Sequence, residues 1–390
     1  MKKALLTKIE ELAPGLCDLS DYIWAHPELG FQEHEACRVL TERLKADGFT
    51  IEMGVGGLET AFRATYQHGE GGPSIGLLAE YDALAGLGHA CAHHMQGPTL
   101  LLCAEAIQAL VTDQPYRLVF YGTPAEEMAP AKQTMWDNGC FRDIDVALMT
   151  HGSVNTACDE SSLASMNYIV TFHGTPAHPG LFPERGRSAF GALQLAFHGM
   201  DLMRAHVTDD TRLHYACLDG GTPPNGIPAS ATGEFFLRCR NSFSYLKEVR
   251  ERFYKIIEGA ALMTGATYEI NDGMVWPNKI PALVLNKNVM ENAVAVDCPE
   301  IAPPRVHTGT TDFAAVLQHV PGTCLRIKMV NAPITSHSPE FAAAGNTDLC
   351  HTAILKAAQA LAGTCWDLIH DSELLPAIQA DYYPRQKAQQ

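Results

Sequence analysis

Residues 75–94, IGLLAEYDALAGLGHACAHH, lead from a short apolar run into a turn that carries one cysteine and three histidines. The apolar run at 75–79 predicts a buried strand, and helical spacing follows at 97–110. A strand, a turn and a helix in succession are typical of an α/β fold. Cys91 and His93 are of the types that bind zinc-like ions, although a buried structural Cys or His is the alternative interpretation.

Two further apolar segments lead to side chains of the same kind. Residues 117–121 run towards Glu126 and Glu127, and residues 146–150 end at His151. Adjacent carboxylates in a turn point in different directions, so one can bind a metal ion while the other faces the reaction. Open α/β sheets place their sites at the carboxyl edge of parallel strands. The sequence therefore predicts a metal site there, with a solvated acidic pair as the alternative.

Composition and charge exclude several classes of protein. The 390 residues are 46% hydrophobic and 18% charged, which predicts a folded chain of about two domains. A net charge of -16 without a Lys/Arg cluster argues against nucleic-acid binding. We expect no membrane span and no export signal, because charged residues interrupt every long apolar run. Twelve scattered cysteines indicate reduced thiols and a cytoplasmic location.

The pattern of elements changes after residue 160. Strand–helix alternation up to that point predicts a mostly parallel sheet flanked by helices. Residues 161–272 follow the order strand, helix, two strands, helix, strand, which is typical of a small α+β domain. We therefore predict an α/β catalytic domain formed by 1–160 and 273–390, interrupted by a smaller α+β domain at 161–272. Residues 385–390 are expected to form a loose tail.

Five segments resemble the M20 metallopeptidases, in the amidohydrolase branch that contains aminobenzoyl-glutamate hydrolases and auxin-conjugate amidohydrolases. They occur in the family's order and span nearly the whole chain: 26–30 (HPELG), 80–84 (EYDAL), 89–93 (HACAH), 124–127 (PAEE) and 336–341 (SHSPEF). The resemblance implies a di-metal catalytic domain interrupted by a lid domain, through which two chains form a homodimer.

The same resemblance implies five metal ligands. Cys91 would bridge two divalent ions. His93 and His151 would complete one of the two sites, and Glu127 and His337 would complete the other. A thiolate ligand favours zinc, whereas carboxylate and water oxygens also suit manganese, and cobalt is a third alternative.

The resemblance also implies that Glu126 would be the general base, which takes a proton from a metal-activated water and passes it to the leaving nitrogen. Asp82 would orient a ligand from behind. In the lid, His178 resembles the residue that reaches the substrate carbonyl, often across the dimer. Asn225 resembles a substrate contact, and Arg240 would bind a carboxylate in bidentate fashion, with Arg238 as the alternative.

The turn at 91–94 departs from the family pattern at two positions. Ala92 stands where Gly is usual, which is costly if the backbone there has a positive φ. His94 replaces a small acid or amide by an imidazole that could itself bind metal. Neither change removes an expected ligand, but together they indicate an unusual substrate or an altered metal geometry.

The sequence thus predicts a metal-dependent hydrolase that cleaves the amide bond of an N-acyl amino acid or an aryl-amide conjugate such as aminobenzoyl-glutamate. A hydrolytic deaminase of an aromatic amino-acid-like compound is an alternative on the same site. A non-enzymatic metal-binding dimer is a further alternative, and the retained Glu126 argues against it because a binding module needs no general base.

Overall fold

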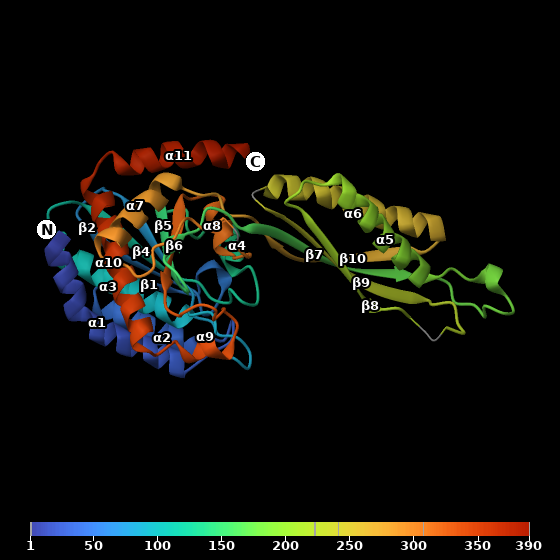
Figure 1. Ribbon diagram of the computed structural model, residues 1–390, viewed down its shortest axis with the longest axis horizontal. Helices are drawn as coiled ribbons and strands as arrows, with labels where there is room; N and C mark the ends of the chain where they lie inside the picture. The colour runs from blue at the N-terminus through green and yellow to red at the C-terminus, as the bar shows by residue number, and fades with distance from the viewer. Residues whose placement is uncertain (1, 222–223, 241, 307, 390) are drawn as a thin grey trace. The chain divides into compact units, whose positions relative to one another are not determined.

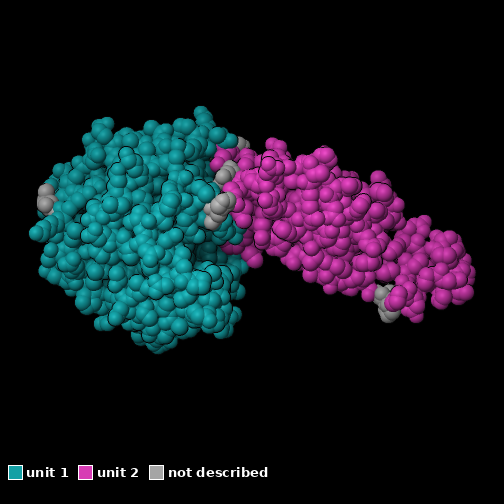
Figure 2. Space-filling model, viewed as in Figure 1, with its two compact units in different colours: residues 1–161, 279–388 teal, residues 162–278, 389–390 magenta. Residues whose placement is uncertain are grey.

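The computed structural model describes residues 2–221, 224–240, 242–306 and 308–389 (Figure 1). The chain divides into two compact units (Figure 2). The first unit comprises Met1–Ser161 and Lys279–Ala388, and the second comprises Ser162–Asn278 with Gln389–Gln390. The sequence predicted 161–272 for the inserted domain. The second unit continues beyond residue 272 because its last strand, β10, runs from Thr267 to Trp276.

A seven-stranded sheet forms the centre of the first unit, in the order β1-β2-β4-β3-β5-β11-β6. Its four central strands are parallel: β4 (Tyr116–Gly122), β3 (Ser74–Ala79), β5 (Val146–Ser153) and β11 (Gly322–Lys328). The outer strands are antiparallel: β1 (Thr50–Met53), β2 (Phe62–His68) and β6 (Ala157–Cys158). The predicted α/β class is confirmed, with antiparallel edges added to a parallel centre.

Helices cover both faces of this sheet (Figure 1). Leu77 and Phe120 face one apolar core, whereas the neighbouring Leu78 and Tyr121 face another, as expected for strands buried on both sides. The larger core is closed by α1 (Lys2–Ala25), α2 (His34–Ala46), α3 (Gln96–Leu110), α7 (Leu283–Ala295) and α10 (Asp348–His370). The smaller core is closed by α4 (Ala131–Asp137) and α8 (Phe313–Leu317).

The chain's C-terminal region corrects one expectation. Residues 385–388, predicted as part of a loose tail, belong to α11 (Leu374–Ala388). Tyr382 anchors this helix, since its side chain is fully buried and its hydroxyl donates to the Leu317 carbonyl at 2.8 Å. Residue 390 lies outside the described residues.

Two chain-wide properties follow from the described structure. All twelve cysteines are free thiols, and only Cys217 is exposed. Among the described helices, none has both the length and the apolar character needed to cross a bilayer.

The second unit follows the predicted order of elements. Its antiparallel sheet runs β10-β7-β9-β8, where β7 is Leu163–His173, β8 is Arg212–Asp219 and β9 is Ser230–Arg240. Two helices, α5 (Ala189–Met203) and α6 (Phe243–Thr264), pack on this sheet around Phe235. Side chains along β9 alternate between buried and partly exposed, so one face of the sheet meets the helices.

Candidate metal centre

Three neighbouring parallel strands bring four of the five predicted ligands to one edge of the sheet, and His337 comes from the segment between β11 and α9. The loop after β3 leads to Cys91 and then to a short 3-10 turn, His93–Met95, from which α3 continues. Glu126 and Glu127 lie in the turn after β4. His151 was predicted to follow its strand, but it lies within β5, because pairing with β11 extends that strand to Ser153.

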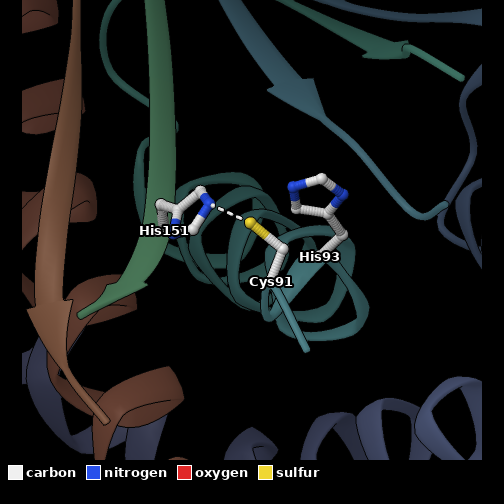
Figure 3. Close-up of side chains that lie close together, drawn as sticks. All are labelled: Cys91, His93 and His151. Atoms are coloured by element: carbon white, nitrogen blue, oxygen red, sulfur yellow. Dashed lines mark hydrogen bonds between the residues drawn. The ribbon is translucent and has the colours of Figure 1, made fainter. Parts of the chain in front are cut away.

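The ligand atoms form two triplets that share Cys91. One triplet is Cys91, His93 and His151, and the other is Cys91, Glu127 and His337, and within each triplet all the atoms lie within 4.8 Å of one another. Cys91 Sγ is 3.5 Å from His151 Nε2, a contact marked by the dashed line in Figure 3. Glu127 Oε1 is 3.3 Å from His337 Nε2. The fold therefore brings together the five side chains in the two groups that the family resemblance implies.

Hydrogen bonds behind the imidazoles fix which nitrogen faces the triplets. His93 Nδ1 lies 2.8 Å from Asp82 Oδ1, and His151 Nδ1 lies 2.8 Å from the Gly152 carbonyl oxygen. Since both partners are acceptors, each Nδ1 carries the proton in the neutral ring, which leaves the lone pair on Nε2 for a cation. Asp82 Oδ2 also accepts from the Glu127 backbone N–H at 2.8 Å. Asp82 thus orients one residue in each triplet.

The donor atoms fit divalent cations. His93 Nε2 and Glu127 Oε1 are buried and make no hydrogen bond among the described residues. Each has one neighbour at 3.3 Å, Glu80 Oε2 for His93 and His337 Nε2 for Glu127. Burial raises the pKa of the Cys91 thiol to about 12. Burial alone would lower the His93 pKa, but Cys91, Glu80 and Asp82 raise it well above its usual value. The pocket favours positive charge, and sulfur, nitrogen and oxygen donors suit zinc-type ions.

Left-handed backbone occurs at three non-glycine residues around the triplets: Ala92 (φ 62°), Ala125 (φ 58°) and His337 (φ 65°). Such residues are rare, and strain of this kind is often found at functional sites. Ala92 therefore has the positive φ at which an alanine is less favourable than the glycine that is usual in the family. Gly152 makes room for the added methyl group, because a Cβ at Gly152 would lie 2.7 Å from Ala92 Cβ.

Replacing Gly152 with Ala is expected to lower the free energy of unfolding by about 1–3 kcal/mol, because the new methyl group overlaps that of Ala92. The double variant Ala92→Gly/Gly152→Ala removes the overlap with Ala92 and leaves that with the flexible Met329 side chain, 2.9 Å from the new Cβ, so it should recover part of this loss. Urea unfolding of both variants measures the difference. Equal destabilisation of the single and double variants would show that the two methyl groups do not compete for space.

His94 belongs to neither triplet, so the structure shows no direct contact through which it would alter the metal geometry. Its Nε2 lies 2.8 Å from the Gly345 carbonyl oxygen, and its ring contacts that of His89. Burial lowers the pKa of His94 to about 4. The imidazole is therefore neutral, and it ties the start of α3 to the segment between α9 (Pro339–Ala343) and α10.

A buried lysine beside the triplets was missed by the sequence reasoning. Lys132 Nζ is 2.7 Å from Glu80 Oε1 and 2.6 Å from Asp312 Oδ1, and all three side chains are buried. Gln96 donates to the other Glu80 oxygen at 2.8 Å. Glu80, Asp312 and Glu126 form a separate group of three carboxylates. The lysine supplies this group with an internal cation, although its sequence context is that of an ordinary helix start.

Glu126 lies next to the predicted ligands. Its carboxylate belongs to a group with His93 and Glu127 whose ligand atoms are within 4.8 Å of one another. Burial raises the Glu126 pKa well above its usual value, and the nearby carboxylates of Glu80 and Asp312 raise it further. Cations bound by the triplets would oppose this shift and favour the carboxylate form that a base requires.

The remaining predicted residues belong to the second unit. His178 is exposed, and its Nδ1 accepts a backbone N–H two residues further along the chain. Asn225 lies in an exposed turn. Arg238 and Arg240 share the face of β9 opposite its buried side chains. The structure groups none of these four described residues with the metal ligands, so their roles remain predictions.

The comparisons with known proteins agree with this architecture. Residues 163–263 match the model of the peptidase dimerisation domain of the M20 family. Human Xaa-Arg dipeptidase is 30% identical over 96% of this chain and 90% of its own length. One of the subunits of the p-aminobenzoyl-glutamate hydrolase of Escherichia coli is 32% identical over 77% of this chain and 65% of its own length.

Solved structures share the fold at low sequence identity. An aminohydrolase structure from methicillin-resistant Staphylococcus aureus superposes with a TM-score of 0.82 at 18% identity, covering 95% of this chain and all of that one. A dinuclear metal-binding M20 peptidase from Bacillus subtilis gives a TM-score of 0.73 at 18% identity, covering 92% of this chain and 99% of its own. With its relatives and its metal-ligand triplets, the chain belongs to the M20 family of metal-dependent peptidases and amidohydrolases.

Proposed function

We propose that this enzyme cleaves the amide bond of an N-acyl amino acid or of an aryl-amide conjugate. The observation that carries the proposal is the pair of triplets sharing Cys91, with the Glu126 carboxylate beside them. The names of two relatives support it, since a dipeptide and p-aminobenzoyl-glutamate are both amides of an amino acid. Zinc or manganese is the metal that the donor set favours.

The proposed chemistry divides between the ions and the side chains. Two bound ions would lower the pKa of a water molecule and polarise the carbonyl group of the substrate. Glu126 would accept the proton of that water and pass it to the leaving nitrogen, since its carboxylate lies beside the ligand atoms without belonging to the two triplets. Asp82 holds His93 and the Glu127 backbone in place.

The second unit supplies the remaining proposed roles. His178 would polarise the substrate carbonyl, and Asn225 and Arg240 would bind the substrate, with Arg240 on its carboxylate. The matched dimerisation domain supports a homodimer joined through this unit. The cytoplasmic location stays a prediction from the sequence.

Turnover on a panel of amides tests the proposal. Metal-loaded protein is expected to hydrolyse at least one N-acyl amino acid or aryl-amide conjugate, with loss of activity after chelation and recovery after metal is restored. Release of ammonia from an aromatic amino-acid-like compound, without amide cleavage, would instead support the deaminase alternative. Full metal binding without turnover on either class would contradict the hydrolase.

A further inference from the structure

Three basic side chains surround one buried carboxylate in the first unit. Asp159 follows β6, and its side chain is only 1% exposed. Lys279 Nζ lies 2.5 Å from Asp159 Oδ2, Arg326 Nε lies 3.3 Å from the same oxygen, and Arg305 Nη1 lies 3.5 Å from Oδ1. The buried Lys279 balances the charge of Asp159. Two guanidinium groups thus lie near this carboxylate in addition to the ammonium group of Lys279.

Arg326 lies next to a predicted metal ligand. In the parallel pairing of β11 with β5, Arg326 is the register partner of His151. Neighbouring residues in register direct their side chains to the same face of a sheet. The Arg326 and His151 side chains therefore lie on the same face of the sheet, on neighbouring strands.

The Arg326 guanidinium has donors left for a ligand. Among the described residues its hydrogen-bond partner is Asp159, which it reaches through Nε, so both terminal nitrogens remain available. Its side chain is 15% exposed, which makes it accessible but largely shielded from water. A guanidinium in such surroundings binds a carboxylate through two parallel N–H bonds more strongly than an exposed one does. Lys328, two positions along β11, is by contrast paired with Glu300.

We infer that Arg326 binds a carboxylate of the substrate beside the metal centre, so that the preferred substrates are anionic amides. This inference rests on the proposed hydrolase function and narrows its substrate class. The carboxylate can belong to the acyl group or to the leaving amino acid. If Arg240 binds the carboxylate of the leaving amino acid, Arg326 binds a second carboxylate, which the acyl group carries.

Four amides and two variants test the assignment. N-succinyl-leucine carries carboxylates on both sides, N-acetyl-leucine on the leaving side, succinanilic acid on the acyl side, and N-acetyl-leucinamide on neither. Arg326→Gln is expected to raise KM about 10-fold or more for the amides whose carboxylate it binds, and to leave N-acetyl-leucinamide unchanged. Arg305→Gln is the matched control. It also removes one positive charge from the surroundings of Asp159, but Arg305 is not the register partner of His151.

Succinate binding to the metal-loaded protein, measured by calorimetry, separates this inference from the proposed function. Arg326→Gln should weaken succinate about 10-fold or more, and Arg305→Gln should not, whether or not an amide is hydrolysed. Equal effects of the two variants, or equal losses on anionic and neutral amides, would overturn the assignment. If Arg326→Gln does not fold, Arg326→Lys carries the test, since it keeps the charge near Asp159 but loses the paired N–H donors.

Discussion

Replacing Glu126 with Gln is expected to lower kcat by about 100-fold or more while the metal content stays unchanged. The amide keeps the shape of the side chain but cannot accept the proton of the attacking water. Glu126 lies beside the ligand atoms and outside the two triplets, so under the proposed assignment the ions do not depend on it. Steady-state kinetics and elemental analysis of the same preparation measure both quantities.

Glu127→Gln is the matched control for this prediction. Its carboxylate is 3.3 Å from His337 and belongs to the second triplet, so this change should cost an ion as well as activity. The two variants differ by one position and carry the same chemical change. If Glu126→Gln lost an ion and Glu127→Gln kept both, the roles of the two carboxylates would have to be exchanged.

Replacing Lys132 with Met is expected to lower the free energy of unfolding by about 3–5 kcal/mol. The ammonium group is fully buried between Glu80 and Asp312, and its removal leaves two carboxylates without their cation. Lys8→Met is the control, since the pair between Lys8 and Glu11 is on the surface and is worth less than about 1 kcal/mol. Denaturant unfolding compares the two variants.

A triple variant keeps this prediction testable if Lys132→Met does not fold. Lys132→Met/Glu80→Gln/Asp312→Asn removes the unpaired charges and should recover part of the lost stability, because the three groups act as one network. A loss below about 1 kcal/mol in Lys132→Met would contradict the assigned role of the lysine.

The sequence predicted the centre of the fold because its central strands are strongly patterned. Residues 75–79, 117–121 and 146–150 are apolar, short and bounded by turn residues, and they form β3, β4 and β5. The ligand types that follow them are uncommon in such turns, so their chemistry was visible in the chain. Cys91 and His93 follow β3 and His151 lies within β5, so the chain order of these segments explains why the three side chains lie close together.

Other features depend on contacts between distant segments, which local patterns do not contain. Lys132 resembles an ordinary helix-start residue, and its buried position between Glu80 and Asp312 depends on two segments far from it along the chain. Arg326 lies in an apolar strand segment, and its neighbour His151 is set by strand register. The helix at 385–388 was missed because Pro384 and the polar residues around it resemble a tail, while Tyr382 anchors it by a tertiary contact.

Metal content in Cys91→Ala tests whether the two triplets hold a pair of ions. The wild-type chain is expected to contain up to two divalent ions, and Cys91→Ala is expected to lose both, together with activity, because the shared thiolate belongs to both triplets. Elemental analysis after gel filtration, with circular dichroism to confirm folding, gives the answer. Two tightly bound ions in folded Cys91→Ala would contradict the shared-ligand centre.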